Sequence, residues 1–256
     1  MKSLCALVVL AAAAVMQALA ADLPKGDCAR PAAATDLSGC DLSRGKLAGR
    51  DLRGARFAGA KLENADLRKA LLEGADFRRS NAKWANFAGA NLAKTDFRDA
   101  DLFHASFDDA DLSDARLGGA NLFGANLINT RAPRADFGGA YLKDILMEGI
   151  DLSGGSIKGC YTFRGVLLGA RLVGTDLSGA DLTGAAAESA DFSKARLLGT
   201  KLLGATLRHA VFTDADMAQA DLANADVWNA NFSGARNLPP SVQDALIEPF
   251  VVRERR

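Results

Sequence analysis

The 256-residue chain has little of what most enzymes and nucleic-acid-binding proteins use. It contains only two histidines, His104 and His209, and aromatic residues make up 7% of it. The 31 lysines and arginines are balanced by 31 aspartates and glutamates. A chain without excess charge of either sign gives no reason to expect a nucleic acid or an anionic membrane as a partner.

Motifs that carry chemistry are also lacking. The sequence has no Gly-rich phosphate loop and no paired-cysteine motif, and Lys158 stands where a nucleophile elbow around Ser156 would need glycine. His104 and His209 are far apart in the sequence, with no third ligand in view to complete a metal site. We therefore predict no catalytic residue, no metal and no cofactor, and expect that the protein is not an enzyme.

Long apolar runs are scarce too, and the single clear one begins near Met1. Lys2 supplies a positive start, residues 4–16 an apolar stretch, and Ala18-Leu19-Ala20 a small-residue cleavage box. This pattern predicts a signal peptide over residues 1–20 and an exported, periplasmic or extracellular, protein. A retained membrane anchor is the alternative, but the run is shorter than the ~20 residues that span a bilayer. No later segment is apolar enough to do so.

What the sequence does have is a repeat of five residues. Leu or Phe recurs at every fifth position from Leu37 to Phe232 in 32 of 40 pentapeptides, and Ala is the commonest residue two positions earlier. The central residue is different in eight pentapeptides: Ala82, Ala132, Met147, Ile157, Thr162, Ala187, Met217 and Val227. A period of five fits neither a helix nor a strand. The chain must therefore turn a corner once per repeat, with the central residue and the small residue both inside, and four corners close a coil of 20 residues.

Runs such as Ala65-Asp66-Leu67 and Ala110-Asp111-Leu112 resemble the pentapeptide-repeat family. The resemblance covers residues 35–235 and implies an all-β fold, the right-handed quadrilateral β-helix, here with about ten coils. We expect a signal peptide at 1–20, an N-terminal cap at 21–34, the β-helix at 35–236 and a C-terminal cap and tail at 237–256. Residues 241–247 are predicted to form a short capping helix.

Residues 20 positions apart should lie above one another in columns. Inward phenylalanines recur at this spacing and should form three stacks, which comprise Phe57, Phe77 and Phe97; Phe87 and Phe107; and Phe192, Phe212 and Phe232. Outward charges alternate in sign along two columns, which contain Asp96, Arg116 and Asp136, and Asp111, Arg131, Asp151, Arg171 and Asp191. Opposite charges on neighbouring coils should attract, so these columns predict a wall crossed by ion pairs.

The cysteines in the repeat region are best interpreted through the same columns. Cys40 and Cys160 share a column but lie six coils apart, about 29 Å at the strand spacing, beyond the reach of a disulfide. In an oxidising compartment Cys28 and Cys40 are the expected pair, joining the cap to the first coil. Cys160 occupies an inward position and is expected to be a buried free thiol.

One outward surface departs from the repeat pattern. Phe103, Phe123 and Phe163 occupy one outward column, interrupted by Lys143, and Tyr141 and Tyr161 lie in the column beside it. Around the next corner are three aliphatic residues: Leu146, Val166 and Leu168. These eight apolar residues form a candidate partner patch, because exposed aromatic clusters with a polar rim commonly mark interaction sites. Two alternatives are stacking that only stabilises the wall, and stacking of a glycan on the rings.

The sequence therefore favours a noncatalytic exported scaffold or protein-binding module, with a protein partner or self-association. The alternative is a purely structural rod or a homodimer without an external ligand. Two weaker alternatives are an envelope enzyme and a topoisomerase-binding mimic of DNA, a role that the resemblance to some cytoplasmic family members suggests. The signal peptide and the balanced charges both argue against DNA mimicry.

Overall fold

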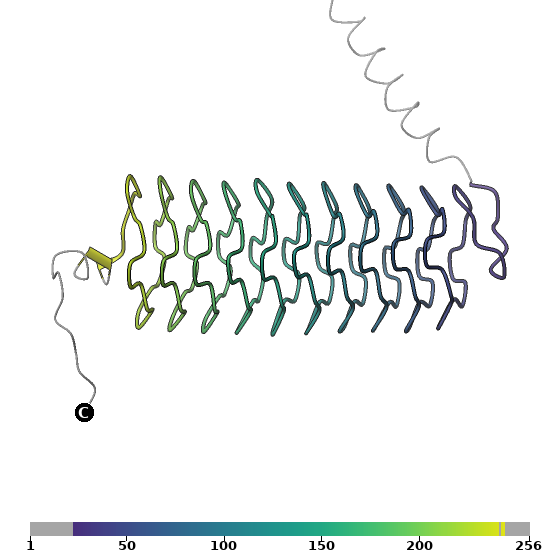
Figure 1. Cartoon of the computed structure of the whole chain (residues 1–256), viewed down its shortest axis with the longest axis horizontal. Coiled ribbons are helices and arrows are strands. Elements are labelled where there is room, and N and C mark those ends of the chain that lie inside the picture. Colours follow the sequence, from purple (N-terminus) through teal and green to yellow (C-terminus); the bar gives the residue numbers. More distant parts are fainter. Residues whose placement is uncertain (1–22, 241, 244–256) are drawn as a thin grey trace, which may run out of the picture.

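The computed structural model describes residues 23–240, 242 and 243, and the predicted signal peptide lies outside them. These residues form a straight rod of stacked coils (Figure 1). Parallel bridges join residues 20 apart without interruption, from Asp36–Arg56 to Asp216–Arg236. Each coil therefore has four sides, and each side contributes a single bridge-forming residue rather than a longer strand. The architecture is a right-handed quadrilateral β-helix, as the pentapeptide pattern predicts.

A tight turn forms every corner of the coil. The backbone N–H of the small residue donates to the carbonyl of the central residue three positions earlier, as in Ala110 to Phe107 at 2.9 Å. The residue between them on the C-terminal side has a positive φ in every pentapeptide, from 69° at Gly39 to 52° at His104. A positive φ at the third residue is what a type II turn requires, and it favours Gly, Asn and Asp.

The outward residue before each centre supports the same turn. Its side-chain oxygen accepts the N–H two residues further on, as Asp36 does from Ser38 at 2.9 Å and Asn86 from Ala88 at 3.0 Å. Aspartate and asparagine suit this local bond better than longer side chains do. The recurrence of these two residues along the repeat is therefore a requirement of the turn and does not by itself indicate a functional carboxylate.

The inward residues fill the tube. Phe77 stacks between Phe57 and Phe97 with ring centroids 4.7 Å away on both sides. The other two stacks predicted from the sequence are present, with Phe87–Phe107 at 4.9 Å and Phe192–Phe212 at 4.8 Å. These separations match the spacing between coils, so one ring occupies each layer of a stack.

Polar residues at the inward small position bond to the next coil. The hydroxyls of Thr130, Thr175 and Thr200 donate to the carbonyl oxygen 23 residues earlier at 2.8 to 2.9 Å. Cys160 follows the same rule, with its sulfur 3.0 Å from the carbonyl oxygen of Phe137. Its thiol is buried and unpaired, and burial raises its pKa to about 12. Such a thiol is protonated at neutral pH and unreactive.

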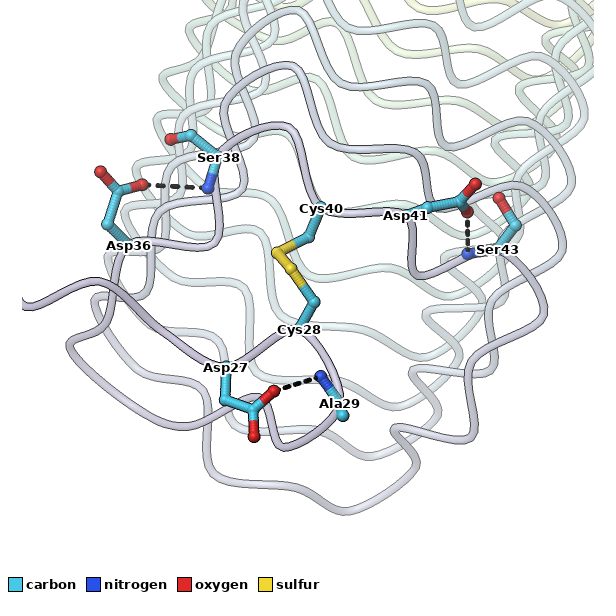
Figure 2. Close-up of a disulfide and its surroundings, with 8 residues drawn as sticks. All are labelled: Asp27, Cys28, Ala29, Asp36, Ser38, Cys40, Asp41 and Ser43. Carbon is cyan, nitrogen blue, oxygen red and sulfur yellow. Dashed lines mark hydrogen bonds between the residues drawn. A yellow bond between two sulfur atoms is a disulfide. The ribbon is translucent and has the colours of Figure 1, made fainter.

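The N-terminal cap is tied to the first coil by covalent and backbone bonds. Cys28 and Cys40 form a disulfide with their Cα atoms 5.6 Å apart, and it crosses the end of the rod (Figure 2). The cap also adds one bridge to the edge of the coil, between Lys25 and Asp36. The backbone N–H of Asp36 donates to the carbonyl of Pro24 at 2.9 Å, so the edge is covered over this stretch.

The C-terminal helix predicted at residues 241–247 falls mostly outside the described residues and stays a prediction. Pro240, Val242 and Gln243 have helical conformation, and Val242 is buried against the core of the rod. Leu238 packs against the same core. Over residues 23–240, 242 and 243, no helix has the length and hydropathy that crossing a bilayer requires.

The narrow tube predicts a large penalty for a bigger inward residue. Ala110 is 1% exposed, and replacing it with Leu should lower the free energy of unfolding by about 1–3 kcal/mol through overpacking. The matched control is Ala93→Leu at a half-buried outward position, which should have little effect. Chemical denaturation of both variants measures the difference, and equal midpoints would contradict this packing.

Candidate functional site

One side of the rod carries a continuous run of aromatic rings. We call it the aromatic strip, and it consists of Trp84, Phe103, Phe123, Tyr141, Tyr161 and Phe163. Ring centroids of consecutive members are 5.4, 5.3, 6.2, 5.5 and 6.0 Å apart in that order. The strip crosses five successive coils, which at the strand spacing is a length of about 19 Å.

The strip changes column halfway along its length. Tyr141 and Tyr161 occupy the bridge column, at positions where neighbouring coils have Asn121 and Asp181. The phenylalanines occupy the turn column two residues later. Lys143 interrupts that column, and its Nζ lies 5.4 Å from the ring centroid of Phe123. This distance permits a cation–π interaction, so the cation is part of the strip rather than a break in it.

The strip is exposed to solvent, more through its largest members than through its phenylalanines. Trp84, Tyr141 and Tyr161 are 50%, 42% and 38% exposed, whereas the phenylalanines are half-buried. The four ring pairs from Phe103 to Phe163 are stacked, with interplanar angles from 5° to 15°. The rings therefore cover one another's faces and present their edges outward.

This orientation bears on the kind of ligand that fits. A sugar ring or a nucleobase that stacks needs an open aromatic face, and insertion between two rings needs about 9 Å between their centroids. The pairs in the strip are at most 6.2 Å apart. A ridged surface of ring edges instead suits the apolar and aromatic side chains of a protein, so the geometry does not favour the glycan alternative.

His104 packs against the strip, although the sequence suggested an ordinary surface residue. Its ring lies edge-on to Phe103 and Phe123, with centroids 4.3 and 5.7 Å away. Gly124 makes room for it, since a Cβ at that position would be 2.5 Å from Cε1 of His104. No group of three or more His, Cys, Asp or Glu side chains in the described part of the chain is placed to hold a metal ion.

Charged side chains beside the strip are paired with one another. At one end Lys83 Nζ lies 3.2 Å from Asp101 Oδ2, and Asn121 donates to Asp101 Oδ1 at 3.0 Å. At the other end Arg164 Nε lies 3.5 Å from Asp144 Oδ1. The strip is therefore apolar along its centre and polar at its rim, which is the usual anatomy of a protein interface.

The aliphatic members of the candidate patch lie on the next side of the rod. Leu146 and Val166 are bridge partners in one column, and Leu168 follows in the turn. All three are half-buried. The structure thus brings the aromatic residues of the patch into one strip and leaves the aliphatic residues around a corner from it.

Two features were missed by sequence reasoning. Trp84 begins the strip, and the signal for it is a large aromatic at a turn position 19 residues before Phe103. A second, separate pair is formed by His209 and Trp228, with ring centroids 4.8 Å apart. It also joins residues 19 positions apart. Columns of residues 20 apart do not reveal such diagonal contacts.

The fold and its surface define a solenoid repeat protein, in which successive short repeats stack and one face is modified. The repeat region matches the family described as "Pentapeptide repeats" in 8 copies, over residues 35–74, 55–92, 83–119, 120–159, 167–202 and 200–236. The chain belongs to the pentapeptide-repeat family. Among curated proteins, none matches the chain.

Solved structures with a similar fold are also pentapeptide-repeat proteins. HetL, involved in heterocyst differentiation regulation in the cyanobacterium Nostoc sp. strain PCC 7120, is 29% identical with a TM-score of 0.50, covering 75% of this chain and 91% of HetL. Rfr23 from the cyanobacterium Cyanothece 51142 is 27% identical with a TM-score of 0.30, covering 41% and 61%. A trypsin-treated form of QnrB1, a plasmid-mediated fluoroquinolone resistance protein, is 21% identical with a TM-score of 0.38, covering 78% and 94%.

Proposed function

We propose that the protein is a noncatalytic, exported scaffold that binds a protein partner through the aromatic strip. In this proposal residues 1–20 are a signal peptide, residues 21–34 and 237–256 cap the two ends, and residues 35–236 form about ten coils. A short C-terminal helix completes the second cap. The rod holds the strip rigid, so little conformational entropy is lost when a partner binds.

The observation that carries the proposal is the position of the two tyrosines. The bridge column is where the repeat uses Asp or Asn, because the side-chain oxygen of these residues accepts a local N–H. Tyr141 and Tyr161 give up that bond and are 42% and 38% exposed. A tyrosine there adds exposed apolar surface without filling the core. Tyrosine and tryptophan are enriched at interfaces, where such surface is buried by a partner.

The disulfide supports export. Disulfides persist in oxidising compartments and are rare in the bacterial cytosol. The bond between Cys28 and Cys40 fixes the cap of the rod and is therefore structural, which fits a periplasmic or extracellular location. The wall charges support a role other than DNA mimicry, because acidic side chains are paired with basic ones, as in Asp111 with Arg131 at 3.0 Å.

The test is affinity capture from an envelope extract, with the mature protein and a Tyr141→Asn/Tyr161→Asn variant as baits. Asparagine is the residue that the repeat itself uses at this position, as at Asn121, so the variant should fold and melt like the parent. We expect it to lose the captured partner. The matched control is Leu71→Asn/Val211→Asn, which makes the same kind of change at the same repeat position on the opposite side of the rod.

The control should capture the same partner as the parent, since Leu71 and Val211 are remote from the strip. If parent, tyrosine variant and control all return one set of proteins, the strip is not the binding surface. The purely structural rod would then be the better account of the fold.

A further inference from the structure

We infer that the partner of the aromatic strip is a second copy of this chain, lying side by side and antiparallel to the first. The two-fold axis would cross the strip midway between the coils of Asn121 and Tyr141. This inference rests on the proposed function of the strip as a protein-binding surface, and it names the partner.

The geometry of the rod makes such a pairing simple to analyse. Bridges 20 residues apart keep each outward column straight along the rod. In an antiparallel two-fold pair, each column faces the same column of the second copy in reverse order. The residues that would meet therefore follow directly from the order of residues in the bridge column and in the turn column.

In the bridge column, every tyrosine meets a polar partner. Tyr161 would face Asp101 of the second copy, and its hydroxyl can donate to that carboxylate. Tyr141 would face Asn121, whose amide can bond to the phenol oxygen. Further out, Asn81 would face Asp181. All of these residues belong to one unbroken series of bridges from Asn81 to Asp181.

In the turn column, the rings and the cation are matched in the same register. Phe103 would face Phe163 of the second copy, so a half-buried ring at one end of the strip covers a half-buried ring at the other. Phe123 would face Lys143, the cation that already lies 5.4 Å from the ring of Phe123 in its own chain. Between two copies the lysine can lie between two aromatic surfaces, which strengthens a cation–π interaction by desolvation.

The antiparallel arrangement is favoured over a parallel one by the same columns. A parallel pair would place the bridge column of one copy against the turn column of the other. Asp101 would then face Phe103, and Asn121 would face Phe123, which leaves polar groups against rings without hydrogen-bond partners. In the antiparallel register, like charges first meet at Lys61 and Lys201, about 17 Å from the axis and outside the strip.

The contact area sets the expected strength. A side of five residues by eight coils covers at most about 600 Å² per copy, from the rise along a strand and the spacing between strands. The total of about 1,200 Å² is at the low end of specific interfaces. We therefore expect a reversible dimer with a dissociation constant in the micromolar range. The net charge of zero gives no long-range repulsion between copies.

Sedimentation equilibrium of the mature protein over a wide concentration range tests the inference. We expect a monomer–dimer equilibrium that the Tyr141→Asn/Tyr161→Asn variant weakens at least tenfold, while Leu71→Asn/Val211→Asn leaves it unchanged. A dimer that survives the tyrosine substitutions would place self-association elsewhere on the rod and overturn the inference.

Cysteine trapping tests the orientation. Lys83 would face Thr183 of the second copy, but in one chain these residues are five coils and about 24 Å apart, too far to form a disulfide. A mixture of the Lys83→Cys and Thr183→Cys variants under mild oxidation should give a covalent dimer, whereas Lys83→Cys mixed with Asn81→Cys, which tests the parallel arrangement, should not. The opposite result would overturn the antiparallel register.

The failures of the two proposals can be told apart. A protein that is monomeric at every concentration and still captures a different protein through the strip contradicts the second copy as partner and leaves the proposed function in place. A monomeric protein whose captured proteins do not depend on the tyrosines contradicts both.

Discussion

Replacing Phe77 with Ala is expected to lower the free energy of unfolding by about 3–5 kcal/mol, the range for deleting a buried ring. Phe77 is fully buried and contacts three other rings: Phe57 and Phe97 at 4.7 Å and Phe87 edge-on at 5.8 Å. The tube walls are held by backbone bonds between coils, so they have little freedom to collapse into the space. The cavity should therefore persist.

The position of Phe77 in a solenoid adds a second expectation. Each coil contacts only its neighbours, so a weakened layer reduces coupling between the coils on either side. We expect a broader thermal transition as well as a lower midpoint. The control is Phe77→Leu, because Leu37 and Leu117 occupy the same inward column, and its cost should be below about 1.5 kcal/mol. Calorimetry on the three proteins measures both effects, and an alanine variant no less stable than the leucine variant would contradict the stacking argument.

The sequence was sufficient to predict the fold because each repeat states its own geometry. The five-residue period places a corner after every centre, and the inward columns predict the three phenylalanine stacks. The left-handed turn residue was not predicted, although the sequence contains its signal. Glycine recurs at this position, and no Val, Ile or Thr does, because branching at Cβ is unfavourable where φ is positive.

Column reasoning was weaker for side chains that reach sideways. It predicted that Asp96 would attract Arg116 on the next coil. In the structure Asp96 is bonded instead to Arg98 of its own turn, with Nη2 2.6 Å from Oδ2. The prediction holds for Asp111 and Arg131, which pair at 3.0 Å. A long arginine two residues after an aspartate reaches the carboxylate more easily than one on the next coil, and this competition decides the partner.

The aromatic strip shows the same limit at the candidate site. Its tyrosines and phenylalanines follow from two columns, but Trp84 and His104 lie in a third column and join the strip by diagonal contacts. Ring orientation also lay beyond the sequence, because column order does not distinguish stacked rings that present edges from rings that lie flat on the wall. That orientation is what separates a surface for proteins from a platform for sugars.

Loss of the disulfide is the other change with a large expected effect. The Cys28→Ser/Cys40→Ser variant should be less stable by about 3 kcal/mol, the chain-entropy estimate for a short closed loop. The bond joins cysteines 12 residues apart at the end of the rod. Unlike the loss of Phe77, its loss should act at one end. We expect the cap to open while later coils stay folded, since coils depend only on their neighbours.

Hydrogen exchange locates that opening. The N–H of Gly26, bonded to Asp36 at 2.8 Å, and that of Asp36, bonded to Pro24 at 2.9 Å, should exchange faster in the variant or in the parent with reductant. Amides in the middle of the rod should not change. Cys160→Ala is the control, because its buried thiol takes no part in the disulfide and reductant should act on this variant as on the parent.

Opening of the cap has a further consequence for the rod. The cap bridge between Lys25 and Asp36 covers the strand edge of the first coil, and Leu37 is fully buried beneath the cap. An uncovered edge with apolar core behind it is a template for end-to-end association. We therefore expect reduced protein to form larger particles by light scattering, and the double serine variant to do so without reductant. Unchanged particle size together with unchanged exchange would mean that the backbone bonds of the cap hold it in place without the disulfide.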